Sequence, residues 1–139
     1  MRASPASKEI SIRTARRCEF IDVTRQAQAF LDDCAARDGL LVLFVPHTTA
    51  GVTINENADP DVARDIVRFT GELIPEKSGF AHGEGNSDAH IKSSLFSPSL
   101  TLIVEGGRLC LGTWQAVYFA EFDGPRSRSL RLKFQPDPA

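Results

Sequence analysis

Residues 99–134 read SLTLIVEGGRLCLGTWQAVYFAEFDGPRSRSLRLKF, and this stretch decides the fold. Four segments in it are rich in apolar, β-branched or aromatic residues: 99–105, 108–112, 113–122 and 127–134. Gly106-Gly107 between the first two is typical of a tight hairpin turn. Asp123-Gly124-Pro125 marks a turn before the last segment. The second half of the chain is therefore predicted to form a mainly antiparallel sheet.

Residues 8–39 are predicted to form one or two strands followed by a helix. From Lys8 apolar and polar residues alternate, which predicts a strand, and a short apolar stretch at 20–23 extends or follows it. Residues 24–39 predict a helix, with Thr24 as N-cap and Gly39 as a C-terminal residue in the left-handed conformation. The predicted buried stripe of this helix consists of Ala27, Phe30, Leu31, Cys34 and Ala35.

A continuous apolar run at 40–45 predicts a strand that is buried on both faces. Residues 51–55 predict another strand. A second helix is expected to begin at Asp59-Pro60, with Asp59 as N-cap and Pro60 in the first turn, and to end at Pro75. Its apolar face is predicted to contain Val62, Ile66, Phe69 and Leu73.

The element order predicts one α+β domain, a mainly antiparallel β-sheet sandwich with two to three helices packed on it. Residues 75–88 form the longest stretch without periodicity, and loops of this length are usually functional or mobile. Residues 89–96 predict a short helix. We expect a disordered tail at 1–7, a single domain at 8–135 and a short tail at 136–139.

Composition excludes several classes of protein. The 139 residues carry a net charge of −2, with 16 basic and 18 acidic side chains, so we expect no nucleic-acid partner. No apolar run reaches the roughly 20 residues of a membrane-spanning helix, and the N-terminus lacks the apolar core of a secretory signal. Three widely spaced cysteines argue against a disulfide framework. These features predict a cytoplasmic domain without a membrane partner.

Three histidines, His47, His82 and His90, are candidates for a site. His47 follows the end of a predicted strand, and the other two flank a glycine-rich segment. If that segment folds back, His82 and His90 can converge, and His47 can complete a metal site or an acid/base cluster. On spacing alone, three independent surface or core residues are the simpler interpretation.

Two further polar segments allow functional and structural interpretations. Asn55 and Glu56 lie between a strand and the next helix, where they can supply oxygen ligands to a divalent ion. The alternative is local capping, which is favoured for Asp59. Gln115 can both donate and accept, which suits recognition of a heterocycle edge. Its alternative is a bulge beside a packed Trp114.

Arg126 and Arg128 follow the Asp123-Gly124-Pro125 turn. If the last strand begins at Arg126, both side chains share one face and can clamp a phosphate or pyrophosphate. Salt bridges to Glu121 or Asp123 are an equally good interpretation. The cysteines are interpreted as small buried hydrophobic residues. Four other arginines are interpreted as solvated: Arg13, Arg16, Arg17 and Arg25.

Four motifs in this order resemble the YjbQ-like family, named as secondary thiamine-phosphate synthases: HTTAGVTINENADPDVARDI at 47–66, HGEGNSDAHIKSSL at 82–95, GGRLCLGTWQ at 106–115 and EFDGPRSR at 121–128. The resemblance extends from about Lys8 to Phe134. It implies an α+β homotrimer with a site near the subunit boundaries. One departure is Ser97, where the family usually has glycine; serine at this position requires a negative φ or some strain.

The family name implies that an aminopyrimidine diphosphate is joined to a thiazole phosphate, with release of pyrophosphate. A divalent metal, Mg or Zn, is the usual aid to a departing pyrophosphate. The motif positions imply His47, His82, His90 and Glu56 as catalytic residues, with the histidines as metal ligands. They imply substrate binding by Asn55, Asn86, Gln115, Arg126 and Arg128. Two alternatives stay open: a metal-dependent hydrolase, and a non-catalytic trimer that binds a small anion or metabolite.

Overall fold

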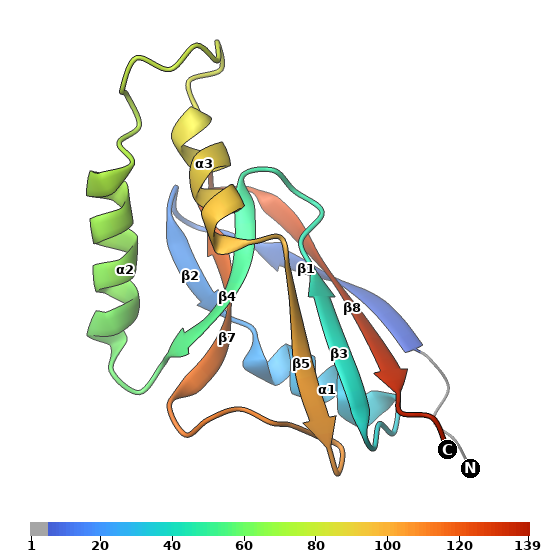
Figure 1. Cartoon of the computed structure of the whole chain (residues 1–139). Helices are drawn as coiled ribbons and strands as arrows, with labels where there is room; N and C mark the ends of the chain where they lie inside the picture. Colours follow the sequence, from blue (N-terminus) through green and yellow to red (C-terminus); the bar gives the residue numbers. More distant parts are fainter. Residues whose placement is uncertain (1–5) are drawn as a thin grey trace.

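Two antiparallel sheets form the body of the protein. The computed structural model describes residues 6–139 (Figure 1). The large sheet has five strands in the order β1 (Ala6–Arg13), β8 (Ser127–Pro136), β3 (Gly39–Phe44), β5 (Ser99–Glu105) and β6 (Arg108–Leu109). The small sheet has three strands in the order β2 (Glu19–Asp22), β7 (Gln115–Glu121) and β4 (Ala50–Glu56). The helices are α1 (Thr24–Asp33), α2 (Pro60–Leu73) and α3 (Ser87–Phe96).

The main core lies between the two sheets. Alternate residues of β8, including Leu130, Leu132 and Phe134, point inward because side chains of a strand alternate between its faces. They meet Val117 and Phe119 of the small sheet, and α1 completes this core. The other face of β7 packs in a second, smaller core that includes α3. β7 is therefore buried on both faces, and the predicted α+β sandwich is confirmed.

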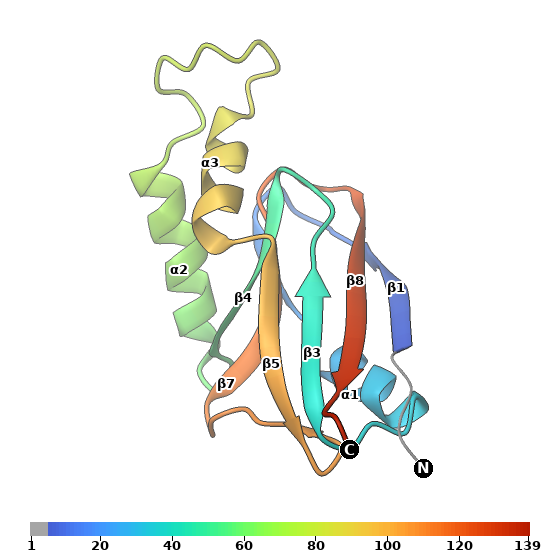
Figure 2. The same cartoon turned by 45° about the vertical axis from the view of Figure 1, so that its right-hand side comes forward.

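Three connections cross between the sheets at one end of the sandwich. They are residues 14–18 between β1 and β2, 45–49 between β3 and β4, and 122–126 between β7 and β8. Figure 2 shows these crossings at the top, together with the segment that joins α2 to α3. The strand pairing places Ala50 opposite Glu121 at this end. Polar side chains from distant parts of the sequence are thereby brought together there.

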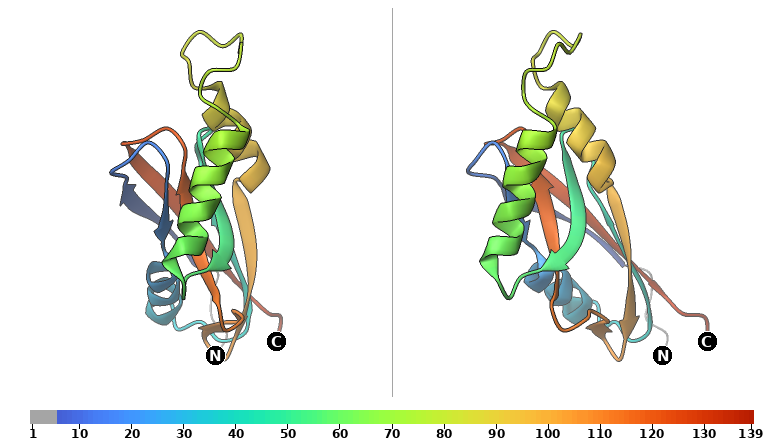
Figure 3. Two further views of the ribbon diagram at one scale, coloured as in Figure 1. Left: turned by 90° about the vertical axis from the view of Figure 1, so that its left-hand side faces the viewer. Right: turned by 60° about the vertical axis from the view of Figure 1, so that its left-hand side comes forward.

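β3 is not buried on both faces, contrary to the prediction. Leu41, Leu43 and Val45 belong to the core, whereas Leu40 and Phe44 are exposed on the outer face of the large sheet. No helix of residues 6–139 covers that face (Figures 1 and 3). Burial therefore alternates along β3, although the residues on both of its faces are apolar.

The apolar face of α2 is exposed. Asp59 caps the helix through the Asp61 N–H, and Pro60 is its first residue, as predicted. Its stripe packs little, however, because Phe69 is 57% exposed and Leu73 is 65% exposed. Figure 3 shows the helix standing beside the small sheet. The sequence correctly predicted an amphipathic helix, but within one chain this face has little to cover it.

The ends of α1 differ from the prediction. Thr24 is already helical, and the N-cap position is occupied by Val23, which makes no side-chain cap; the Thr24 N–H donates to the Asp22 carboxylate just before the helix. At the other end the left-handed residue is Ala35, with φ of 51°. The Ala36 N–H then reaches back to the Leu31 carbonyl. Gly39 instead begins β3, where a side chain would collide with the Gln135 carbonyl.

The ends of the domain also extend beyond the predicted limits. β1 includes Ala6 and Ser7, which were assigned to the tail, and the rest of that predicted tail, residues 1–5, lies outside the described residues. β8 continues to Pro136. None of the helices in residues 6–139 combines the length and apolar character needed to span a membrane.

Ser97 adopts a positive φ of 80°, a conformation that favours glycine. Two hydrogen bonds hold it there: its N–H donates to the Ser93 carbonyl, and its carbonyl accepts from the Val52 N–H. The backbone is thus fixed by α3 on one side and by β4 on the other. The sequence left two possibilities for Ser97, a negative φ or a strained positive φ, and the structure has the strained positive φ.

Replacing Ser97 with glycine should stabilise the protein. Relief of the strain outweighs the extra freedom of the unfolded chain and the loss of the exposed hydrogen bonds between the Ser97 hydroxyl and the Ser99 backbone, and we expect the free energy of unfolding to rise by about 1 kcal/mol. Urea unfolding measures it. Ser94→Gly, in the exposed interior of α3, is the control and should instead lose about 0.5 kcal/mol. A loss of stability in Ser97→Gly would contradict the strain argument.

Candidate functional site

A polar cavity of about 460 Å³ opens at the end where the three connections cross. Its walls come from the β3–β4 connection, the α2–α3 segment, the start of α3 and the β7–β8 turn. The polar residues that line it are His47, Thr48, Thr49, His82, Glu84, Asn86, His90, Asp123, Arg126 and Arg128. This combination of basic, acidic and amide groups makes it the candidate site.

All three histidines line this one cavity, as the cluster hypothesis expected. The rings of His82 and His90 lie 5.3 Å apart, centroid to centroid, and are nearly perpendicular. His47 is held separately, because its Nε2 accepts a hydrogen bond from the Ser129 N–H at 2.9 Å. The cavity therefore has a histidine pair from the α2–α3 region and a third histidine anchored to β8.

The bond to Ser129 defines the protonation state of His47. An Nε2 that accepts a hydrogen bond needs its lone pair, so the proton of the neutral ring must be on Nδ1. Partial burial, and then the positive charge of Arg128, lower the pKa of His47 below its usual value. His47 is therefore neutral at pH 7 and offers an N–H donor at Nδ1.

The predicted metal site is not preformed. Across residues 6–139, no three His, Cys, Asp or Glu side chains are grouped so that they could hold a metal ion. Nε2 of His47 is also engaged with the backbone of β8. Binding of Mg or Zn by the three histidines would require their side chains to move.

Arg126 and Arg128 do not form one clamp, because β8 begins at Ser127 rather than at Arg126. Arg128 is turned into the protein, with its side chain 5% exposed, and its Nε donates to Glu121 Oε1 at 2.9 Å. Arg126 is 52% exposed and donates to the Asp123 carboxylate at 2.9 Å. Both salt bridges considered for this turn are formed, and only Arg126 remains accessible.

The carboxylate of Glu121 is fully buried and hydrogen-bonded on all sides. It accepts from Nε and Nη2 of Arg128, from the Thr14 hydroxyl at 2.8 Å and from two backbone N–H groups, of Phe122 and Asp123. Burial by itself would raise the pKa of Glu121, but the hydrogen bond to Arg128 and the other donors outweigh it and lower the pKa. The pair is therefore ionised inside the protein.

Arg17 is the functional residue that the sequence missed. The sequence interpretation makes it solvated, yet its guanidinium donates to both oxygens of the buried Asp88, at 2.9 and 3.1 Å. It also lies 3.7 Å from Glu76 and 3.8 Å from Asp123. Glu76 and Asp88 lie at the two ends of the segment that carries His82. Arg17 thus links both ends of that segment to the β7–β8 turn.

Asp88 and Lys92 belong to the same network, but nothing in the sequence shows that they are buried or that Arg17 is their partner. They are four residues apart on α3, both are buried, and their charged groups lie 3.5 Å apart. Burial by itself would raise the pKa of Asp88, but the hydrogen bond and charge of Arg17, with the charge of Lys92, outweigh it and lower the pKa. The buried Asp88 carboxylate is thus bound by two cations, Arg17 and Lys92.

Asn55, Glu56 and Gln115 lie away from the cavity. Glu56 pairs with Gln115 at the opposite end of the small sheet, six residues along β7 from Glu121, or about 20 Å. Gln115 is engaged locally, since its side chain accepts from the Gly112 N–H. Trp114 is exposed rather than packed, so the proposed bulge around a packed Trp is wrong. Within one chain these three residues do not join the histidines.

The cysteines are less buried than predicted. Cys18 and Cys34 are half-buried and Cys110 is exposed, and all three are free. Burial raises the pKa of the Cys18 thiol, although the charges of Lys92 and Arg17 oppose it. None of the three lines the candidate cavity.

Comparison with known proteins identifies the family. Residues 8–137 match the sequence model described as UPF0047 protein YjbQ-like. The chain belongs to this family. It is 52% identical to UPF0047 protein MJ1081 of Methanocaldococcus jannaschii over 126 residues, 91% of each chain. It is 51% identical to UPF0047 protein YugU of Bacillus subtilis, over 91% of this chain and 96% of the relative.

Solved structures of UPF0047 relatives share the fold. An uncharacterised YjbQ/UPF0047 protein from Clostridium acetobutylicum superposes with a TM-score of 0.91 at 49% identity, over 92% of this chain and 99% of that chain. A protein of unknown function from Sulfolobus solfataricus reaches a TM-score of 0.92 at 26% identity, over 96% and 99% of the two chains. The architecture described above is therefore that of the family.

Removing Arg128 should destabilise this UPF0047 protein far more than removing Arg126. Arg128→Ala leaves the buried Glu121 carboxylate without its cation, which costs about 3–5 kcal/mol. Arg126→Ala, the matched control, removes an exposed pair and costs about 0–1 kcal/mol. Denaturant unfolding at pH 7 measures both losses.

The effect of Arg128→Ala should also depend on pH. The pKa of Glu121 is lowered by folding, so the pair stabilises the protein above the ordinary carboxyl pKa, about 4.3. Its contribution is lost as the pH falls through the pKa of the folded state, and the difference between wild type and variant should shrink in acid. Equal losses for the two arginine variants at pH 7 would contradict the assignment.

Proposed function

We propose that the cavity binds a phosphate-bearing small molecule and that the protein acts as a thiamine-phosphate synthase, as its main activity or a side activity. The observation that carries this proposal is the convergence of three histidines and the exposed Arg126 on one polar cavity. Arginine and histidine N–H groups are the donors that proteins use to bind phosphates. Of the two acidic residues of the cavity, Asp123 is paired with Arg126, and Glu84 is exposed and lies 4.0 Å from His82.

The reaction joins an aminopyrimidine diphosphate to a thiazole phosphate. The bond between the pyrimidine methylene carbon and the diphosphate oxygen breaks, and its electron pair leaves with pyrophosphate. The thiazole nitrogen then forms the new C–N bond and becomes positively charged. No proton has to be removed, so the main catalytic requirement is stabilisation of the departing pyrophosphate.

The donors of the cavity suit this requirement. Two nitrogens of Arg126 bond Asp123, which holds the guanidinium in place while half of the side chain stays exposed. His47 contributes the Nδ1–H that its bond to Ser129 enforces. His82 and His90 complete the wall and are candidates for giving a proton to the leaving group.

We further propose that the protein assembles as a homotrimer in the cytoplasm. Two apolar surfaces are exposed in the single chain: the α2 face with Phe69 and Leu73, and the outer face of the large sheet with Leu40, Phe44 and Ile103. Exposed apolar patches are usual at protein interfaces. Two different faces can pair head to tail, and such contacts close into a three-membered ring when each rotates the next subunit by a third of a turn. Three free cysteines suit a reducing compartment.

Binding and turnover test the proposed function. We expect calorimetric binding of pyrophosphate to the wild type, weakened about tenfold by Arg126→Lys, which keeps the charge but loses the planar fork. With both substrates present, thiamine phosphate should form, and His82→Ala should slow its formation at least about 100-fold. Lys77→Ala, in the same exposed segment but outside the cavity wall, is the control and should behave as wild type.

The alternatives give different results in the same experiments. Pyrophosphate binding with no thiamine phosphate formed would indicate the non-catalytic anion-binding protein. Hydrolysis of the diphosphate that requires added metal would indicate the hydrolase. No binding of pyrophosphate at all would overturn the proposed function. Rescue of a thiamine auxotroph by the wild type, but not by His82→Ala, would connect the activity to this cavity in the cell.

The assembly is tested separately. Light scattering should give three times the mass of one chain for the wild type. Phe69→Lys places a charge on the exposed face of α2 and should shift the mass toward the monomer, because a charge at an apolar contact is costly. Arg25→Ala, on the exposed side of α1, should leave the mass unchanged. A wild type that is monomeric at micromolar concentration would contradict the trimer.

A further inference from the structure

Asn86 carries a hydrogen-bond acceptor with no partner. Its Oδ1 is buried, and of the buried side-chain nitrogen and oxygen atoms in residues 6–139 it is the one without a hydrogen bond. The residue as a whole is only 8% exposed, and it lines the candidate cavity. A buried amide oxygen without a donor costs about 1–3 kcal/mol, so an unpaired one in a cavity wall calls for an explanation.

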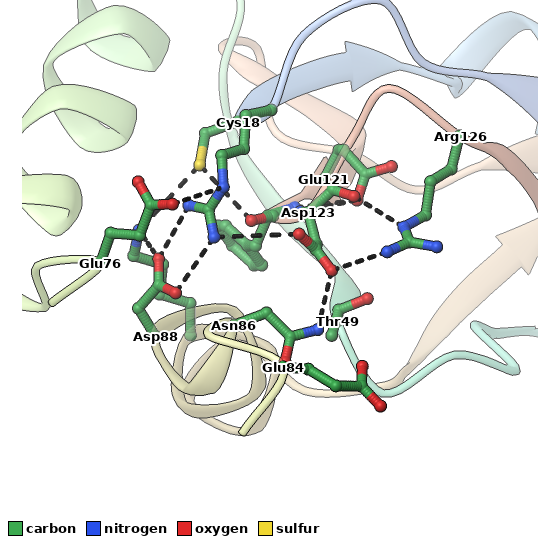
Figure 4. Close-up of polar contacts among 12 residues, drawn as sticks. Cys18, Thr49, Glu76, Glu84, Asn86, Asp88, Glu121, Asp123 and Arg126 are labelled. Atoms are coloured by element: carbon green, nitrogen blue, oxygen red, sulfur yellow. Dashed lines mark hydrogen bonds and ion pairs between the residues drawn. The ribbon is translucent and has the colours of Figure 1, made fainter. Parts of the chain in front are cut away.

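The orientation of this amide is fixed by Asp123. Asn86 Nδ2 donates to Asp123 Oδ2 at 2.9 Å, and the same carboxylate oxygen accepts from Arg126. Turning the amide over would place two acceptor oxygens against each other. The Asn86 oxygen therefore has to face away from Asp123, as Figure 4 shows. The Asn86 oxygen is therefore left unpaired because Asp123, in the β7–β8 turn, binds the amide nitrogen.

The cavity thus has two chemically different parts. Arg126 and the Nδ1–H of His47 are donors, which suit the oxygens of a phosphate. Asn86 Oδ1 is an acceptor, which suits an N–H or O–H group. A ligand that carries only phosphate would leave that acceptor unpaired. A ligand with both a phosphate and a donor group would satisfy the two parts together.

We propose that the ligand of this cavity carries an N–H or O–H donor beside its phosphate groups, and that Asn86 recognises that donor. The inference rests on the proposed function and specifies which of the two substrates binds beside Asn86. The aminopyrimidine diphosphate has an amino group that can donate, whereas the thiazole ring has no N–H or O–H. The amino-bearing diphosphate is therefore the substrate that binds here.

Access to the acceptor is through the segment before α3. Every residue from 75 to 85 is exposed, and Gly79 and Gly85 have positive φ. Asn86 follows this exposed segment and lines the cavity, so a ligand in the cavity approaches its amide from the cavity side. Asn86 itself is kept in place by Asp123 and by the start of α3.

Selectivity between two ligands tests the proposal. Calorimetry compares the aminopyrimidine diphosphate with an analogue in which hydrogen replaces the amino group, and inorganic pyrophosphate serves as the common reference. The wild type should bind the amino ligand about 10- to 100-fold more tightly than the analogue. In Asn86→Ala the two ligands should bind within about twofold of each other. Asn57→Ala, an exposed asparagine outside the cavity, should keep the wild-type ratio.

The outcomes distinguish recognition of the donor group by Asn86 from phosphate binding by the cavity. Pyrophosphate binding with no preference for the amino ligand in the wild type overturns this inference and leaves the proposed function standing. A preference that persists in Asn86→Ala overturns the assignment to Asn86. Failure of the wild type to bind pyrophosphate overturns the proposed function and this inference with it. If Asn86→Ala does not fold, Asn86→Leu keeps the side-chain volume, and the wild-type ratio alone still decides the ligand class.

Discussion

The buried ion pair of Glu121 and Arg128 holds the functional end of this molecule together. Glu121 ends β7 in the small sheet, and Arg128 lies near the start of β8 in the large sheet, so the pair joins the two sheets across their gap. Thr14 and Thr49, which belong to the other two crossings, bond to the same pair. A charge pair without water needs every remaining donor and acceptor satisfied, and here the three crossings provide them. The geometry of the cavity wall depends on this arrangement.

A second charged network gives the opposite wall. Arg17 binds Asp88 at the start of α3, approaches Glu76 in the segment after α2, and lies near Asp123 in the turn; Figure 4 labels these three carboxylates. Asp123 in turn bonds Arg126 and Asn86. Asp123 thus holds two of the groups that line the cavity, Arg126 and Asn86. Of the two turn arginines only Arg126 remains available for recognition, and of the Asn86 amide only the oxygen.

The sequence predicted the strands and turns well because local patterns determine them. Gly106-Gly107 can adopt the positive φ that a tight turn requires, and Asp59-Pro60 combines a capping carboxylate with a fixed φ in the first turn, so both occur where expected. The four motifs, and the histidines within them, identified the family and one cavity. Facts that depend on distant partners were not predictable. Arg17 has no neighbour in sequence that shows its pairing with Asp88. The exposed face of β3 is made of apolar residues, so the sequence of β3 cannot show which of its faces is buried. The distance between Gln115 and His47 depends on the strand register, which exists only in the assembled sheet.

The central claim is that a phosphate-bearing ligand binds at the end of the sandwich where the chain crosses between sheets. Titration of the isotope-labelled protein with pyrophosphate, followed by NMR of the backbone and imidazole signals, tests it most directly. The account predicts saturable shifts at His47, His82, His90 and Arg126, with the histidine rings responding most. Shifts confined to the opposite end, at Asn55, Glu56 and Gln115, with none in the cavity, would contradict it.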